Sequence, residues 1–126
     1  MVLVDSNILI RFSRGDDVVA KWLEGFEEST ELRVSNITRM ELLIGSRDKA
    51  HLKKIRQFLS RYLTIHINEM ISQRASSLIE AYNLSHGLQI ADSLIAATAL
   101  ELDCELATIN RKDFRFIEDL RLVDYR

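Results

Sequence analysis

The sequence predicts a three-layer α/β/α fold, in which helices cover both faces of a mostly parallel sheet of about five strands. Two observations support this fold class. Short apolar runs bounded by turn-forming residues alternate with longer segments whose apolar residues recur at helical spacing. One of these helical segments, residues 88–102, is apolar on nearly every side, which is typical of a buried helix.

The composition predicts a single cytoplasmic domain over residues 1–126. Of these residues 47% are hydrophobic, enough for a substantial core. The longest uncharged apolar stretch, residues 93–100, is too short to span a bilayer, and the N-terminus lacks the basic start of a signal peptide. The one cysteine, Cys104, fits a reducing compartment. The formal net charge of -2 gives no general sign of a polyanionic partner.

The first elements in order are a strand, two helices and a second strand. A buried strand at residues 2–4 precedes a short helix that Ser6 or Asn7 is expected to cap. A second, amphipathic helix covers about residues 16–27. The next strand occupies residues 32–34.

Two helices are expected after the second strand. Ser35 or Asn36 caps the first of them. The predicted apolar face of this helix consists of Ile37, Met40 and Ile44. The second helix lies within residues 44–62, where six basic residues face a single acid. Its apolar stripe consists of Leu52, Ile55, Leu59 and Tyr62.

The remaining elements continue the alternation. They are a strand at 63–67, a long helix that stops at Gly87, the apolar helix at 88–102, a strand at 106–109, one or two helical turns at 112–117 and a last strand at 122–123. Because strands connected by helices run parallel, this order predicts a parallel sheet covered on both faces.

Three acids occupy positions where the pattern predicts burial. Asp5 directly follows the first strand, and Glu41 lies on a predicted apolar helix face, four residues after Ile37. Asp92 lies in the first turns of the apolar helix. Burying an ionised carboxylate costs roughly several kcal/mol unless a partner compensates it. Neither helix has a basic residue placed to do so, which points to a bound cation or to a basic partner from elsewhere.

Two further polar residues, Asn110 and Asp113, follow the strand at 106–109 in the same strand-then-acid arrangement as Asp5. Each acid also has an ordinary structural explanation. Asp5 could cap a helix, Glu41 could lean out toward solvent, and Asn110 with Asp113 resembles a capping box. It is much less probable that all of these structural explanations hold at once than that any one of them does.

Several carboxylates around one cavity suit Mg²⁺ or Mn²⁺, which prefer oxygen ligands. Such ions activate water and stabilise both oxygens of an in-line displacement at phosphorus. Phosphodiester cleavage is therefore the chemistry that fits these residues. An aspartyl-phosphate enzyme of the haloacid dehalogenase type also places an Asp after its first strand, but it needs a second Asp at the position that Asn7 holds here.

Four segments in this order resemble the PIN domain, specifically the VapC-type toxins of type II toxin–antitoxin systems. They read VDSN, ITRMELLIG, GLQIADSLIAATAL and LATINRKDF. The resemblance covers essentially the whole chain. It implies a PIN-like fold and a Mg²⁺-dependent endoribonuclease, with Mn²⁺ as a substitute and with tRNA or rRNA as substrate. A catalytically silent PIN-like binding module is the alternative.

The resemblance also implies roles for individual residues. The acids typical of the family fall on Asp5, Glu41 and Asp92, and the fourth position is shared by Asn110 and Asp113. Asp5 and Asp92 would hold the main ion, with Asp113 or Asn110 touching it directly or through water. Glu41 would help with a second ion or orient the attacking water. Two further residues match the family's hydroxyl positions, Ser6 and Thr108.

The resemblance implies partners as well. They are a VapB-type antitoxin that blocks the acidic pocket, the RNA substrate and a second copy of the chain in a homodimer. The basic segment suggests an RNA-binding track at Lys53, Lys54 and Arg56, although such a run is equally typical of a solvated helix face. The three histidines, His51, His66 and His86, fit ordinary structural roles.

Overall fold

Four short strands and six α-helices alternate along the chain in the structure, which is a computed structural model. It describes residues 1–123 and, within that range, all side chains except those of residues 27–29. The elements are β1 (Val2–Val4), α1 (Ser6–Ser13), α2 (Asp17–Ser29), β2 (Leu32–Ser35), α3 (Asn36–Ile44), α4 (Lys49–Leu59), β3 (Leu63–Ile65), α5 (Glu69–His86), α6 (Ile90–Glu101), β4 (Glu105–Ala107) and the 3₁₀ turn η1 (Arg111–Asp113). None of the helices described is long and apolar enough to cross a membrane.

The sheet is parallel throughout, with the strand order β3-β2-β1-β4. The expected fifth strand is wrong, because Leu122 forms only an isolated parallel bridge with Leu106. Two backbone hydrogen bonds join Leu106 to this segment: the Leu106 N–H donates to the Arg121 carbonyl, and the Leu106 carbonyl accepts the Val123 N–H. These two bonds anchor the segment beside β4, but they do not extend into a strand.

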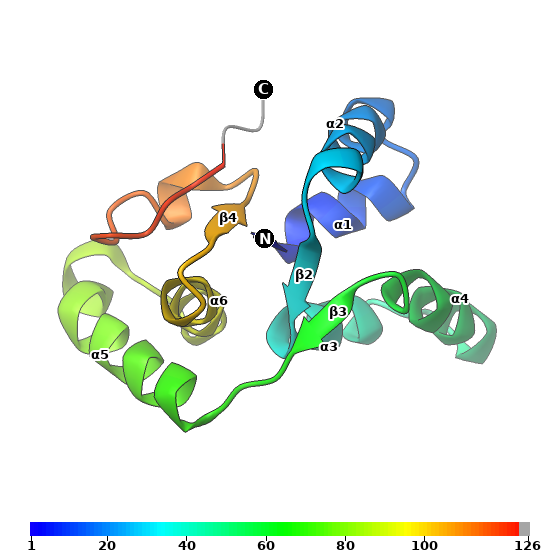
Figure 1. The fold of residues 1–126 in the computed structure, drawn as a ribbon. Coiled ribbons are helices and arrows are strands. Elements are labelled where there is room, and N and C mark those ends of the chain that lie inside the picture. Colours follow the sequence, from blue (N-terminus) through cyan, green and yellow to red (C-terminus); the bar gives the residue numbers. More distant parts are fainter. Residues whose placement is uncertain (124–126) are drawn as a thin grey trace.

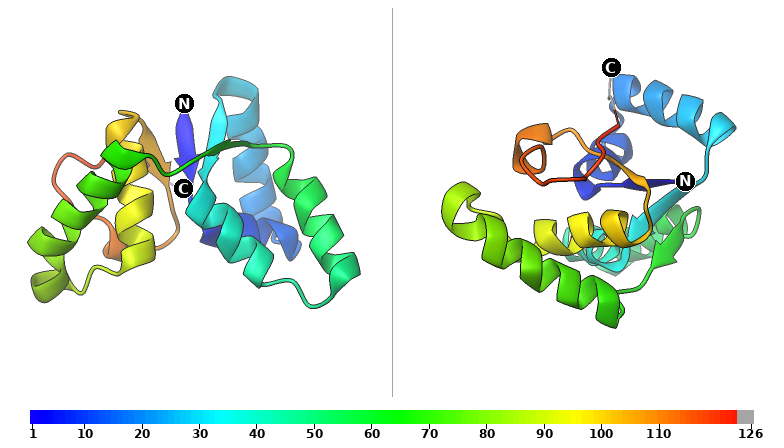
Figure 2. Two further views of the ribbon diagram at one scale, coloured as in Figure 1. Left: turned by 90° about the horizontal axis from the view of Figure 1, so that it is seen from below. Right: turned by 60° about the vertical axis from the view of Figure 1, so that its left-hand side comes forward.

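Helices cover both faces of the sheet, as the alternation predicts. In β1 the side chains of Val2 and Val4 join one core, beneath α1, α2 and α4. Leu3 points to the opposite face and joins a second core with α5 and α6. Figure 1 shows α5 and α6 on one side and α1, α2 and α4 on the other, and Figure 2 shows the same separation from below. The central strand β1 is therefore enclosed on both faces.

The first helix is capped differently from the expectation. Asp5, not Ser6 or Asn7, is the N-cap of α1, and its carboxylate accepts the backbone N–H of Ser6. The helix begins one residue earlier than the Ser/Asn pattern suggests, because β1 leads directly into it. The cap explanation for Asp5 is thus correct, but it occupies only one of the two carboxylate oxygens.

The buried face of α3 is not the predicted one. Met40 and Ile44 are 43% and 83% exposed, whereas Thr38 and Leu42 are buried. The sequence offers two overlapping ladders at helical spacing, and the strand–helix junction at Ser35 turns the Thr38–Leu42 ladder toward the core. Glu41 lies beside the Thr38–Leu42 ladder and is half-buried. Its burial was predicted, but from membership of the Ile37, Met40 and Ile44 face.

Candidate active site

Asp5 lies at the carboxyl end of the central strand and is only 4% exposed. Its Oδ2 accepts a hydrogen bond from the Thr108 hydroxyl at 2.8 Å and another from the Asn7 amide at 3.1 Å. Its Oδ1 accepts the Ser6 N–H at 2.8 Å. Burial raises the pKa of Asp5, while the hydrogen bonds from Thr108, Ser6 and Asn7 lower it. The carboxylate is therefore oriented firmly by neutral donors, and no cation among the described residues pairs with it.

Asn7 connects the ends of β1 and β4, a role that the sequence analysis missed. Besides Asp5, its amide nitrogen contacts the Thr108 hydroxyl at 3.3 Å, and its Oδ1 accepts the Ile109 N–H at 3.3 Å. The Thr108 hydroxyl in turn accepts the N–H of Asn110 at 3.1 Å. The sequence gives little signal for this role, because α1 also contains Ser6, Arg11 and Ser13, so one more polar residue in its first turn does not stand out.

Glu41 reaches this site from α3. Its Oε1 is buried and has no hydrogen-bond partner. Burial raises the pKa of Glu41, the negative charge of Asp5 raises it further, and the Ser6 hydroxyl lowers it. A buried carboxylate oxygen without a donor costs free energy unless something fills the vacant position.

The pKa of Asp92 responds to the charges of the other three acids. Burial raises its pKa from 3.8 to about 6, and the charges of Asp5, Asp113 and Glu41 contribute, in that order. Like charges raise one another's pKa only when they lie close together. The four carboxylates that the sequence singled out, at the end of β1 and in α3, α6 and η1, are therefore near enough for Asp92 to feel the charge of the other three.

Asn110 takes a different position. It is exposed, and as the N-cap of η1 it makes no side-chain hydrogen bond to the turn. The capping-box explanation for Asn110 and Asp113 is therefore not observed. The carboxylate of Asp113, in contrast, is half-buried, and its negative charge raises the pKa of Asp92.

The donor chemistry of the cluster suits a hard cation. All four side chains offer carboxylate oxygens, and within residues 1–123 no ion pair engages any of them. The partnerless Oε1 of Glu41 adds a vacant acceptor. In the described part of the chain, however, no three His, Cys, Asp or Glu side chains already form a group that could hold a metal ion. The residues fit such an ion by chemistry, and they would have to draw closer around it.

The basic residues singled out in the sequence separate in the structure. Lys54 lines a cavity next to Glu41, whereas Lys53 and Arg56 are exposed on α4 and do not line it. The same cavity includes Arg14 and Arg47, for which no role was predicted, and His51, which was expected to have an ordinary structural role.

Comparison with known proteins assigns the family. The family model for the PIN domain matches residues 2–119. The chain belongs to the PIN-domain family. Among curated relatives of this PIN domain, Ribonuclease VapC10 of Mycobacterium tuberculosis is 34% identical over 122 residues, covering 96% of this chain and 91% of the relative. Ribonuclease VapC19 of the same organism is 33% identical over 123 residues, covering 96% and 98%.

Solved structures agree with the VapC assignment. A toxin–antitoxin complex from Klebsiella pneumoniae contains a chain 31% identical to this PIN domain, with a TM-score of 0.84 and coverage of 100% of this chain and 98% of that one. VapBC2 from Rickettsia felis, bound to a DNA fragment from its promoter, gives 26% identity and a TM-score of 0.81, with 98% of each chain covered. The VapC resemblance and the α/β fold are confirmed.

Proposed function

We propose that this VapC-type protein is the toxin of a type II toxin–antitoxin pair and acts as a Mg²⁺-dependent endoribonuclease, with Mn²⁺ as a substitute. The observation that carries the proposal is the group of four carboxylates, none of which forms an ion pair with a described residue, in which burial and mutual repulsion raise the pKa of Asp92 to about 6. Such a cluster is stable at neutral pH when a divalent cation joins it. The ribonuclease names of the curated relatives support the same reaction.

The proposed metal ligands are Asp5 and Asp92, and Asp113 would contact the same ion directly or through water. A bound Mg²⁺ would supply an activated water and stabilise the charge that develops on the phosphate. The Thr108 and Asn7 hydrogen bonds hold the Asp5 carboxylate in one orientation. Glu41, with its vacant Oε1, is placed to orient the attacking water or to accept its proton. Asn110 lies at the exposed rim, where it would contact the ion only through water.

The partners follow from the same chemistry. Related solved structures are toxin–antitoxin complexes, some with promoter DNA. We infer a VapB-type antitoxin for this chain, because an acid cluster without an internal cation would attract a basic side chain of a partner. The substrate would be an RNA such as tRNA or rRNA, and the protein would act in the cytoplasm as a single domain that forms a homodimer.

The reaction is tested by replacing Asp5 with Asn. The amide can still cap α1 but carries no charge, so we expect the loss of RNA cleavage in Mg²⁺ with an unchanged circular dichroism spectrum. The matched control is Asp17→Asn, which removes one exposed acid from α2 and should cleave like the wild type. Cleavage by Asp5→Asn at the wild-type rate would refute the metal assignment. Absence of Mg²⁺ and Mn²⁺ binding by the wild type would instead favour a PIN-like binding module without activity.

A further inference from the structure

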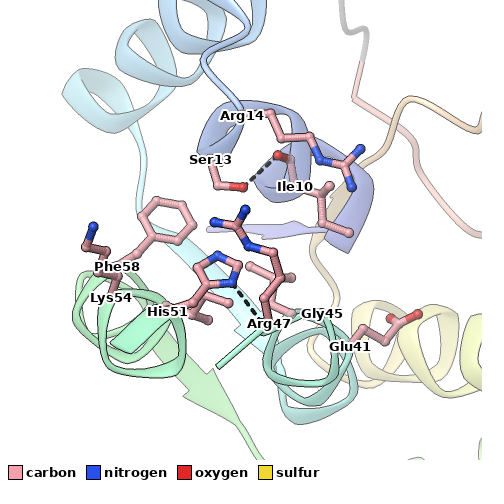
Figure 3. A pocket seen from close by; sticks show the side chains of 11 residues that line it. Ile10, Ser13, Arg14, Glu41, Gly45, Arg47, His51, Lys54 and Phe58 are labelled. Carbon is pink, nitrogen blue, oxygen red and sulfur yellow. Dashed lines mark hydrogen bonds between the residues drawn. The ribbon is translucent and has the colours of Figure 1, made fainter. Parts of the chain in front are cut away.

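A cavity of about 760 Å³ opens beside the acid cluster. It lies between α1, α3 and α4, and Glu41 belongs to both its lining and the cluster. Figure 3 shows the Glu41 carboxylate at one end, directed toward α6, while Arg47 and His51 lie between α1 and α4 and the side chains of Arg14 and Lys54 point to opposite sides of them. The cavity and the proposed cleavage site are therefore continuous through Glu41.

The lining of this cavity is strongly cationic. Arg14, Arg47 and Lys54 contribute three positive charges, and Glu41 is the one acid among the lining residues. Within the part of the chain that the structure describes, none of these three cations forms an ion pair. In Figure 3 the Arg47 guanidinium reaches over His51 toward the end of α1, away from Glu41. Their charge is thus available to an anion in the cavity.

His51 adds a donor with a fixed orientation. Its Nδ1 accepts the backbone N–H of Arg47 at 3.0 Å. A ring nitrogen that accepts a hydrogen bond carries no proton, so the proton of the neutral ring is on Nε2. Because the donor is the backbone N–H of Arg47, this hydrogen bond does not depend on the Arg47 side chain. One wall is apolar and includes Ile55 and Phe58. The Phe58 ring stacks on Phe12 with centroids 5.4 Å apart, so a base would pack beside this pair of rings.

An acidic cleavage site has an electrostatic difficulty with its substrate. Four carboxylates repel the phosphates of RNA, so a substrate needs cations close to the site to hold the neighbouring backbone. Arg14, Arg47 and Lys54 line the cavity that Glu41 also lines, so they can meet the backbone beside the cleavage site. The cavity volume also falls in the usual range of about 300–1,000 Å³ for small-ligand sites, which a nucleotide fits.

We propose that this cavity binds one nucleotide of the RNA substrate next to the scissile phosphate. Arg47 and the Nε2–H of His51 hold its phosphate, Arg14 and Lys54 contact the neighbouring phosphates on either side, and its base packs against the wall that contains Phe58. The inference rests on the ribonuclease function proposed above and adds a substrate subsite to it. The cations act on binding, because they hold a flanking nucleotide and not the reacting atoms.

Binding without cleavage tests the subsite directly. The probe is a short, fluorescently labelled single-stranded RNA of mixed sequence, titrated in EDTA and followed by fluorescence anisotropy at several salt concentrations. We expect the double variant Arg47→Ala/Lys54→Ala to bind about tenfold more weakly and to reduce the salt slope by about 1.4, because each single-strand phosphate contact contributes about 0.7. The control variant Lys21→Ala/Arg74→Ala removes the same charge from exposed positions on α2 and α5 and should change neither quantity appreciably.

Cleavage kinetics in Mg²⁺ give a second readout. The cavity variant should raise KM while kcat stays close to wild type. If both double variants weaken RNA binding equally, the effect is one of net charge and the subsite is refuted. If the cavity variant keeps wild-type affinity and KM but no longer copurifies with the cognate antitoxin, the cavity is an antitoxin surface and the proposal is likewise refuted.

These outcomes separate the subsite from the proposed function. A wild-type protein that binds RNA through Arg47 and Lys54 but does not cleave it in Mg²⁺ would refute the ribonuclease and leave the binding site in place. A wild-type protein that cleaves RNA, with the cavity variant unchanged in affinity and KM, would refute only the subsite.

Discussion

Asp92 is the residue whose surroundings most oppose a negative charge. Burial is the largest cause of its raised pKa, and the repulsion from Asp5, Asp113 and Glu41 follows. An unfolded chain lacks both effects, so the folded protein takes up a proton at Asp92 more readily than the unfolded chain does. Ionisation of Asp92 therefore destabilises the metal-free fold.

This gives a pH-dependent stability prediction for Asp92→Asn. The folded pKa of about 6 lies above the ordinary 3.8, so stability is lost as pH rises through this interval. In EDTA at about pH 8, the variant should be more stable than the wild type by at most about 3 kcal/mol, and by less because Asp92 is only partly buried. Near about pH 4 the difference should nearly vanish.

Urea unfolding in EDTA at both pH values measures the effect. Asp17→Asn, an exposed acid, is the control and should show no comparable pH-dependent gain. An Asp92→Asn variant that is less stable than the wild type at the higher pH would contradict the repulsive cluster.

At the scale of single residues, the sequence singled out the acids and the hydroxyl residues Ser6 and Thr108, but not Asn7 or Arg47. Asp5, Glu41 and Asp92 stand out because each is a charge in a local apolar pattern, which needs no knowledge of the fold. Asn7 and Arg47 could not be found this way. Asn7 matters through contacts 101 and 102 residues away, and Arg47 through a cavity built by three helices.

At the scale of elements, α5 ends at a glycine whose backbone conformation explains why the helix stops there. Gly87 follows the helix with φ +70, in the left-handed region, and its N–H bonds back to the Asn83 carbonyl. A Cβ built there would meet nothing within 4 Å, so a substitution would be strained only through the backbone. This separates conformational strain from packing.

We expect Gly87→Ala to lower the free energy of unfolding by about 1 kcal/mol. Gly25→Ala is the matched control: Gly25 lies inside α2, also with nothing within 4 Å of its added Cβ, and alanine there should stabilise by about 0.5–1 kcal/mol. Chemical denaturation of the two variants should therefore give opposite signs. Equal effects would show that the left-handed conformation of Gly87 is not what matters.

The elements themselves were largely predictable, and the misses have physical reasons. Capping residues, glycine stops and apolar runs are local, so β1, α2, α5 and α6 lie close to where the sequence places them. The face of α3 was predicted wrongly, because Met40 and Ile44 form a ladder as regular as the buried one. The last strand was wrong because pairing depends on the partner strand, which short apolar runs do not specify.

At the scale of the whole molecule, the net charge of -2 conceals a separation of charge. Four carboxylates gather where β1, α3, α6 and η1 meet, and three cations line the adjoining cavity between α1, α3 and α4. The whole-chain charge gave no sign of an RNA partner for this reason. The local field matters for binding because salt screens charges over about 8–10 Å.

Metal binding should stabilise the whole fold. Mg²⁺ at about a hundred times its dissociation constant should add about 2.7 kcal/mol to the free energy of unfolding, because it binds the folded cluster and not the unfolded chain. Thermal unfolding in Mg²⁺ and in EDTA measures this gain. Asp5→Asn should lose most of it, whereas Asp17→Asn should retain it. Identical melting temperatures of the wild type in both buffers would contradict the metal site.

The hydrogen bond between Asp5 and Thr108 also bears on synthesis at the ribosome. The two residues are 103 positions apart, and β4, which carries Thr108 to its place, pairs directly with β1. Asp5 is therefore translated long before its donor Thr108, although its other donors, Ser6 and Asn7, follow it at once. The acid cluster of this PIN domain is therefore complete only after β4 has been made and has paired with β1. A growing chain that still lacks β4 leaves the Asp5 carboxylate without its Thr108 donor.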